Sequence, residues 1–259
     1  MKLSITADLV YDLDAPTDML LQIEVPDHDG QRIADPQIHT TPVDVFRRVA
    51  ATNDVGERCW IRAEGQFHVT YTSTVTVDRT DAPLEGLPAT PLPDLPARAV
   101  RYLFPSRLSP ADRLASWVRA NFGHLSGGAR IAAMRDWIAA EFSYVPGSSD
   151  AQTTALDTFL ERQGVCRDYA HVMIALARAS DIPARFASVY APRVTPQDFH
   201  AVAEVHLDGA WHLVDPTGMA HPSEMAVIGV GKDATEVSFL TGFGPMTLVS
   251  QTVDVRGST

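Results

Sequence analysis

Cys166 stands where a glycine-containing turn leads into an apolar helical segment. The stretch reads RQGVCRDYAH over residues 162–171 and runs directly into VMIALARAS. A cysteine in the first turn of a helix faces unsatisfied backbone N–H groups and the positive end of the helix dipole, and both favour the thiolate over the thiol. We therefore predict that Cys166 is a nucleophile. We also predict that Gly164 adopts a positive φ, which would lift the sulfur to the surface.

Thiol catalysis also needs an imidazole within hydrogen-bond reach and a third group that orients it. Two strand-like runs flank Asp208-Gly209, which predicts a β-hairpin. If the loop has two or four residues, His200 and Asp215 are diagonal neighbours on one face of the hairpin, whereas a three-residue loop would place them on opposite faces. Such neighbours lie about 7–8 Å apart, a gap that the two side chains can close. The expected catalytic residues are thus Cys166 as nucleophile, His200 as base and Asp215 as orienting acid.

The histidines of this hairpin raise the alternative of a metal site. In the same register His206 and His212 fall on opposite faces, and His200 and His206 are about 20 Å apart along one strand at ~3.3 Å per residue. The sequence contains no HExxH motif and no paired CxxC motifs. We therefore predict no metal and no cofactor.

Composition limits the other function classes. The chain has 259 residues, of which 45% are hydrophobic and 20% charged, as expected for one or two globular domains. A net charge of −11 argues against a nucleic-acid or anionic-membrane surface. The apolar runs are shorter than the roughly 20 residues of a membrane span, and acidic residues near the N-terminus are atypical of a signal peptide.

Two cysteines are too few for a disulfide framework. A reducing cytoplasm is therefore the expected compartment. With the composition above, we expect a soluble, unprocessed protein that acts on a peptide or protein substrate. The sequence predicts no particular oligomeric state. Cys59 lies in a strand-like run, ERCWIRAEGQFHVTYTSTVTV, and is expected to be only a small buried hydrophobic residue.

Secondary-structure signals change near residue 80. Residues 1–80 are typical of β-structure, with strand candidates at Met19 to Val25 and Gln66 to Val77 and a turn at Asp29-Gly30. Residues 81–98 contain five prolines and predict a linker or an extended strap.

Four helices and several strands are predicted after the linker. Ser109-Pro110 is expected to begin the first helix, and Gly164 to stop the third. The expected helices are ADRLASWVRANF, about 129–142, ALDTFLERQ and about 166–180, and the expected strands are ARFASVYAP, FHAVAEVHL, AWHLVDP and one or two more in the tail from Lys232.

Around Cys166, His200 and Asp215 the sequence resembles the transglutaminase-like superfamily, whose core is related to papain-type cysteine proteases. The matching pieces are GVCRDYAHVMIALARASDIPAR and DFHAVAEVHLDGAWHLVDPT, with FSYVPG upstream and GKDATEVSF downstream. The resemblance covers about residues 96–259, and residues 1–80 look like the β-rich N-terminal region of bacterial members. It implies an α+β protein with a β-sandwich-like N-terminal domain (1–80), a Pro-rich linker (81–98) and a transglutaminase-like catalytic domain (99–259) of helices packed on an antiparallel sheet.

The resemblance implies acyl transfer through a thioester, with Cys166 as nucleophile, His200 as base and Asp215 as orienting acid. The animal cross-linking enzymes have Gly-Gln-Cys-Trp where this chain has Gly-Val-Cys-Arg, and it has no EF-hand-like calcium loop. A cysteine peptidase or amidase is therefore expected. The alternatives are a transglutaminase that transfers the acyl group to an amine and a non-catalytic binding module on the same fold.

Other residues near the nucleophile receive secondary roles. The backbone N–H of Cys166 should be one oxyanion donor, and Tyr144, Gln163 and Gln152 are candidates for the second. Tyr144 is preferred because of its place in FSYVPG. Three residues that follow Cys166 are expected to lie outside the chemistry. Arg167 is expected to be solvated, Asp168 to complement the helix dipole and His171 to pack against a neighbouring element.

Overall fold

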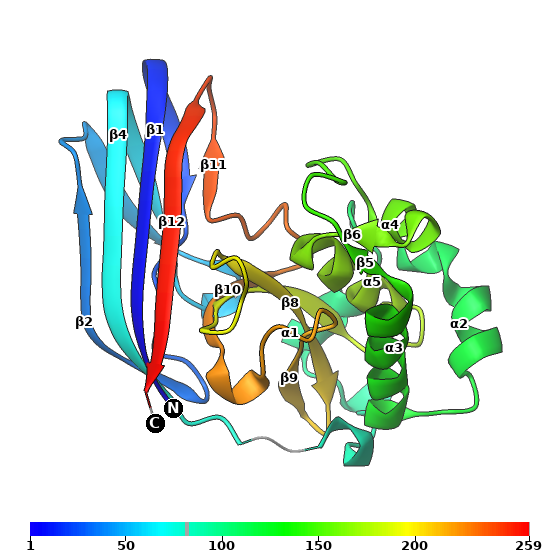
Figure 1. The fold of residues 1–259 in the computed structure, drawn as a ribbon. Coiled ribbons are helices and arrows are strands. Elements are labelled where there is room, and N and C mark those ends of the chain that lie inside the picture. The colour runs from blue at the N-terminus through cyan, green and yellow to red at the C-terminus, as the bar shows by residue number, and fades with distance from the viewer. Residues whose placement is uncertain (81–82, 259) are drawn as a thin grey trace.

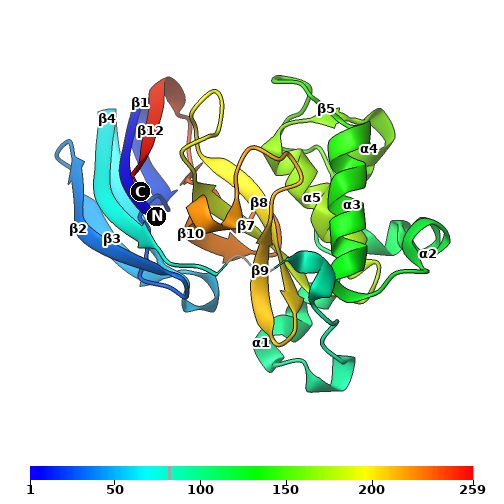
Figure 2. The same cartoon turned by 60° about the horizontal axis from the view of Figure 1, so that its bottom comes forward.

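The computed structural model describes residues 1–80 and 83–258, and they form an α+β protein with antiparallel sheets. A four-stranded sheet lies between a six-stranded sheet and a group of helices (Figures 1 and 2). The six-stranded sheet contains β1 (Lys2–Leu21), β2 (Gln31–Thr40), β3 (Val45–Ala50), β4 (Glu57–Val77), β11 (Leu240–Gly242) and β12 (Thr247–Ser258). The four-stranded sheet has the order β10 (Ala226–Gly231), β7 (Ala184–Tyr190), β8 (His200–Leu207) and β9 (Ala210–Val214).

The helices and two short strands complete the described elements. The helices are α1 (Ala97–Val100), α2 (Ala115–Phe122), α3 (Gly127–Glu141), α4 (Ala155–Glu161) and α5 (Cys166–Arg178), and the parallel strands are β5 (Ser143–Tyr144) and β6 (Gln163–Gly164). Short 3-10 helices are η1 (Thr52–Asp54), η2 (Leu84–Gly86), η3 (Leu92–Asp94), η4 (Arg101–Leu103), η5 (Ala111–Arg113) and η6 (Pro222–Glu224). None of the described helices is both long and apolar enough to cross a membrane.

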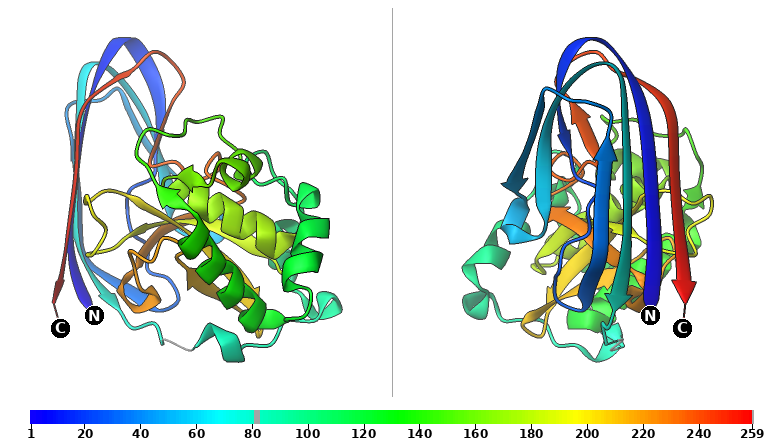
Figure 3. Two further views of the ribbon diagram at one scale, coloured as in Figure 1. Left: turned by 45° about the vertical axis from the view of Figure 1, so that its right-hand side comes forward. Right: turned by 90° about the vertical axis from the view of Figure 1, so that its left-hand side faces the viewer.

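The six-stranded sheet folds back on itself. Strands β1 and β4 pair along most of their length, with an irregularity between Leu13 and Thr17 opposite Gly65, whose φ is +73°. The strands arch over at this point (Figure 3). Buried residues from both halves of β1, such as Leu3 and Met19, then share one core because alternate positions point inward. This confirms the expected sandwich-like, strand-rich N-terminal region.

The C-terminal tail does not stay with the helical region. Strand β12 pairs with β1 from Lys2 opposite Ser258, so the two termini lie side by side (Figure 1). The resemblance assigns the tail to residues 99–259, but a strand's own sequence does not specify the sheet that it joins. Residues 81–82 of the expected linker lie outside the described residues, and the division into domains stays a prediction.

The four-stranded sheet is covered on both faces. Ala203 and Val205 of β8 pack in the same core as α5, whereas Val202 lies in a core on the opposite face. Tyr190 of β7 donates its hydroxyl to the carbonyl of Ile23 and so links this sheet to the N-terminal one. The sequence analysis missed β10, because AVIGVG is buried throughout and lacks the alternation of a strand with one exposed face.

The hairpin of β8 and β9 has the expected register. Ala203 opposes Val214, and the two-residue turn at Asp208 and Gly209 has φ values of 48° and 76°. Two positive φ values are typical of a type I′ turn, whose twist matches that of the flanking strands. The expectation at Ser109 was wrong: Ser109 is buried, η5 follows it, and α2 begins only at Ala115.

Candidate active site

Cys166 is the first residue of α5, as predicted. Its thiol is free and half-buried, and Val165 before it is extended, with φ −114° and ψ −179°. The remainder of α5 from Asp168 onward is buried against β7, β8 and the neighbouring helices. The start of the helix is therefore held rigidly by the packing of its body.

The expected conformation of Gly164 was wrong. Its φ is not positive; Arg162 is the left-handed residue, with φ 57°, and it ends α4. A glycine is needed at 164 for space instead, because a Cβ there would lie 2.7 Å from the Cβ of Asp168. The guanidinium of Arg162 lies over the ring of Trp137 at 4.4 Å, so the left-handed residue is fixed by packing.

His200 and Asp215 are brought together as the hairpin register predicted. His200 begins β8 and Asp215 follows β9, and Nε2 of His200 lies 2.9 Å from Oδ2 of Asp215. Their side chains are 0% and 1% exposed. A hydrogen-bonded pair shielded from water interacts far more strongly than one on the surface.

The carboxylate of Asp215 is held by further donors. Oδ1 accepts from the backbone N–H of Thr217 at 2.9 Å and from its hydroxyl at 2.7 Å, and Oδ2 accepts from the N–H of Ala220 at 2.9 Å. Burial raises the pKa of Asp215, but the hydrogen bond and charge of His200 and the Thr217 hydrogen bonds outweigh burial and lower it overall. Asp215 is therefore ionised near neutral pH. The sequence analysis missed Thr217, although its place two residues after an aspartate is typical of an Asx-turn.

The imidazole of His200 favours its charged form. Burial lowers the pKa of His200, but hydrogen bonding to Asp215 and Cys166, together with their charges, outweighs burial and raises it to about 9. Nδ1 is buried and makes no hydrogen bond of ordinary geometry with the described residues. Since Nε2 is engaged by Asp215, Nδ1 is the ring nitrogen left for the Cys166 thiol.

Of the three expected oxyanion candidates, the structure brings Tyr144 to Cys166. Burial and the charge of Cys166 raise the pKa of Tyr144 to about 12, although hydrogen bonding to the Cys166 backbone acts to lower it. Gln163 pairs with Ser143 in the β5–β6 ladder and so lies on the opposite face from Tyr144. Among the residues that the structure describes, no hydrogen bond joins Gln163 to Cys166, and Gln152 accepts a hydrogen bond from Arg107 instead.

The residues that follow Cys166 are more engaged than expected. Arg167 is not simply solvated, since it pairs with Asp168 at 3.0 Å and donates to the hydroxyl of Ser149 at 2.8 Å. His171 packs as predicted: its ring lies 5.3 Å from that of Phe186. Burial lowers the pKa of His171 to about 4, so the ring stays neutral in the core. Cys59 is buried as expected.

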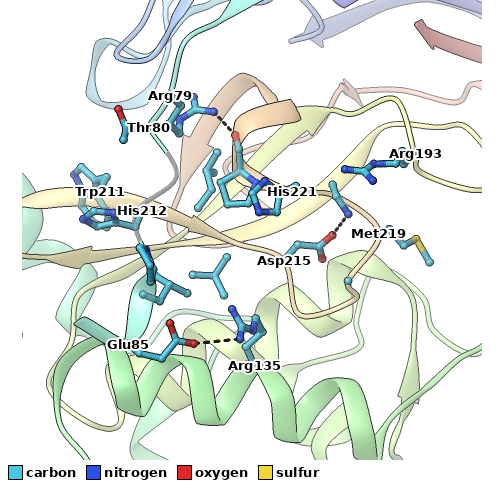
Figure 4. A pocket seen from close by; sticks show the side chains of 17 residues that line it. Arg79, Thr80, Glu85, Arg135, Arg193, Trp211, His212, Asp215, Met219 and His221 are labelled. Atoms are coloured by element: carbon cyan, nitrogen blue, oxygen red, sulfur yellow. Dashed lines mark hydrogen bonds and ion pairs between the residues drawn. The ribbon is translucent and has the colours of Figure 1, made fainter. Parts of the chain in front are cut away.

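A cavity of about 920 Å³ adjoins Asp215 (Figure 4). Its lining includes Arg79, Arg135 and Trp211, but neither Cys166 nor His200. Of the three expected catalytic residues, only Asp215 lines this cavity. A reacting carbonyl is instead expected beside the half-buried Cys166 thiol and Tyr144.

Comparisons with known proteins point to one superfamily. The family model described as “Transglutaminase-like superfamily” matches residues 123–216, which include all three expected catalytic positions. A solved structure from Cytophaga hutchinsonii named “Putative Cysteine Protease” is 31% identical, covers 99% of this chain and 90% of its own, and superposes with a TM-score of 0.93.

Curated sequences match over a shorter region. An uncharacterized protein of Mycobacterium leprae is 31% identical over 121 residues, and one of Mycobacterium tuberculosis is 28% identical over 117 residues. These matches cover 43% and 39% of this chain, and 43% and 37% of the mycobacterial proteins. The chain thus spans less than half the length of the curated relatives that it matches.

Proposed function

The chain belongs to the transglutaminase-like superfamily, and from this premise we propose that it is a thiol-dependent acyl-transfer enzyme that hydrolyses peptide or amide bonds. The observation that carries the proposal is the buried hydrogen bond between His200 and Asp215, with the Cys166 thiol close enough to contribute to the raised pKa of His200. Thiol catalysis requires a nucleophile, a base that contacts it and an acid that orients the base, and Cys166, His200 and Asp215 would fill these roles.

In the first half-reaction, the Cys166 thiolate attacks the carbonyl carbon of the substrate. A C–S bond forms and the carbonyl π electrons move to oxygen, where the N–H of Cys166 and the hydroxyl of Tyr144 stabilise the negative charge. The imidazolium of His200 gives its Nδ1 proton to the amide nitrogen, the oxyanion electrons re-form the carbonyl double bond, the C–N bond breaks, and the amine leaves. Cys166 then carries the acyl group as a thioester.

In the second half-reaction, water replaces the amine. Neutral His200 accepts a proton from the water as its oxygen attacks the thioester carbon, and the C–S bond breaks to release a carboxylic acid and the thiolate. Asp215 remains ionised throughout and keeps Nδ1 of His200 directed at the sulfur, because it holds Nε2. An amine in place of water would give a transglutaminase by the same steps.

A substrate-profiling screen tests the proposal. Peptide and amide libraries are incubated with wild type, Cys166→Ala and His200→Ala, and both hydrolysis and incorporation of a labelled amine are scored. We expect hydrolysis by wild type, and a loss of at least about 10³-fold in kcat/KM for both variants, because each removes one member of a cooperating set. Cys59→Ala is the matched control, since it removes the other, buried cysteine and should leave turnover unchanged.

Two outcomes contradict the proposal in different ways. Amine incorporation that exceeds hydrolysis would assign the protein as a transglutaminase. If no library member reacts, the rate of iodoacetamide alkylation is followed across pH in the Cys59→Ala background. A rate that rises only above about pH 8, as for an unperturbed thiol, and that His200→Ala leaves unchanged would indicate a non-catalytic module.

A further inference from the structure

Asp168 clamps the turn that precedes the nucleophile. Its side chain is 1% exposed, and its Oδ2 accepts the backbone N–H of Val165 at 2.9 Å, as the third residue of a helix does in a capping box. The carboxylate folds back over Gly164, where an added Cβ would meet Oδ2 at 3.0 Å. The backbone just before Cys166 is therefore bonded to a buried acid in the first turn of α5.

The same carboxylate reaches the loop that follows Tyr144. The hydroxyl of Ser149 donates to Oδ2 of Asp168 at 2.5 Å, and Arg167 donates to Oδ1 through Nε and Nη2 at 3.1 and 3.0 Å. Arg167 also donates to the Ser149 oxygen, which closes a ring of three side chains. A helix cap alone requires only the bond to Val165, so the link to Ser149 needs a separate explanation.

The segments of Tyr144 and Cys166 are joined at two places. One is the short parallel ladder, in which Tyr144 opposes Gly164 and the N–H of Val145 donates to the Gly164 carbonyl at 2.9 Å. The other is the Asp168 network. These two attachments hold the segment that carries Tyr144. They restrict the distance of this segment from the start of α5 and its rotation relative to the helix.

We infer that Asp168 is a positioning residue that sets the spacing between the two oxyanion donors, the N–H of Cys166 and the hydroxyl of Tyr144. The inference rests on the proposed function, since only an acyl-transfer reaction develops an oxyanion there. Asp168 takes no direct part in the chemistry, because its carboxylate is buried and bonded to Val165, Ser149 and Arg167. Preorganised donors lose much of their effect when they are misplaced by as little as 1 Å.

The experiment compares Asp168→Asn with Asp157→Asn. Asp157 is the matched control, because it is the third residue of α4 and bonds to the backbone N–H and hydroxyl of Thr154, away from Cys166. For Asp168→Asn we expect a fall of about 100-fold in kcat with KM within twofold of wild type. Asp157→Asn should change neither constant by more than twofold.

Two thiol reagents distinguish an effect on the oxyanion site from an effect on the reactivity of the Cys166 sulfur. A peptide aldehyde adds to the thiolate: a C–S bond forms, the carbonyl electrons move to oxygen, and His200 supplies the proton. Its affinity should fall in Asp168→Asn by a factor similar to kcat. Alkylation by iodoacetamide displaces iodide and develops no oxyanion, so its rate should stay within about twofold of wild type.

Ser149→Ala keeps the test decisive if Asp168→Asn folds poorly. It removes the link to the loop while the Val165 cap remains, and we expect kcat and aldehyde affinity to fall about tenfold together. Unchanged kcat in Ser149→Ala, or an alkylation rate that falls as far as kcat in either variant, would overturn the inference. Wild type that neither turns over substrate nor binds the aldehyde would instead remove the proposed function, and the inference with it.

Discussion

At the scale of residues, the site depends on two buried groups whose environments shift their pKa values in opposite directions. His200 is held as a cation and Asp215 as an anion, although burial opposes both charges. The pair is tolerated because Thr217 donates two hydrogen bonds to Oδ1 of Asp215, and Ala220 donates a further one to Oδ2, the oxygen that His200 also contacts. A buried ion pair without such partners would cost more in desolvation than it gains from attraction.

The raised pKa of His200 makes the stability of the fold depend on pH. The pKa is about 9 in the folded protein and ~6.5 in an unfolded chain, so this pair contributes fully below about pH 6.5 and its contribution is lost as the pH rises through 9. The difference corresponds to on the order of 3 kcal/mol. We expect the free energy of unfolding of wild type, measured with urea, to fall by up to this amount between pH 6.5 and 9.5.

Asp215→Asn should flatten this fall, because without the carboxylate the pKa of His200 drops toward its ordinary value. Asp157→Asn, which removes a carboxylate remote from His200, serves as the control and should follow wild type. Parallel curves for wild type and Asp215→Asn across this pH range would contradict the assigned cause.

At the scale of elements, the start of α5 determines where the sulfur lies. The helix begins at Cys166 because Asp168 bonds to the N–H of Val165, and its body is fixed by burial on β7 and β8. The turn before it has room for no side chain at Gly164. Local capping thus sets where the helix begins, and the packing of its body sets where that start lies relative to His200.

Gly164→Ala tests this steric requirement. The added Cβ would lie 2.7 Å from the Cβ of Asp168, so either the turn or the helix start must move. We expect about 1–3 kcal/mol of destabilisation, as is usual for overpacking, and at least tenfold lower turnover because the nucleophile is displaced. Urea unfolding and a turnover assay measure the two effects.

Gly86→Ala is the matched control, because its added Cβ would meet nothing within 4 Å and its φ is not positive. It should remain within about 0.5 kcal/mol of wild type with full turnover. Wild-type stability in Gly164→Ala would show that the turn relaxes freely and that glycine is not required there.

At the scale of the whole molecule, the two ends of the chain close one sheet. Strand β12 covers the edge of β1, and Val253 and Val255 enter the N-terminal core. Without β12, β1 would present a row of unpaired backbone groups. The N-terminal sheet is therefore completed by residues that follow the catalytic region in sequence.

Val253→Ala tests the contribution of the tail to the core. Val253 is 6% exposed, so loss of its two methyl carbons should lower the free energy of unfolding by about 2 kcal/mol. Val249 in the same strand is 51% exposed, and Val249→Ala should stay within about 0.5 kcal/mol of wild type. Equal effects of the two substitutions in urea unfolding would indicate that β12 does not pack on the sheet in solution.

The sequence by itself determined the parts of this protein that local chemistry fixes. Asp208-Gly209 specifies a two-residue type I′ turn, that turn fixes the register of β8 and β9, and the alternation of strand residues then places His200 and Asp215 together. The apolar run after Cys166 likewise predicted the helix and the position of the thiol at its start.

Only the tertiary structure decided the contacts between segments that are distant or locally ambiguous. No sequence pattern indicates that β12 joins β1 or that Ser149 bonds to Asp168, and the glycine at 164 is required for space and not for a positive φ. Turn type and side-chain alternation act over a few residues and can be read from them. The partner of a strand or a buried carboxylate depends on how separate surfaces pack together, and no local pattern encodes that choice.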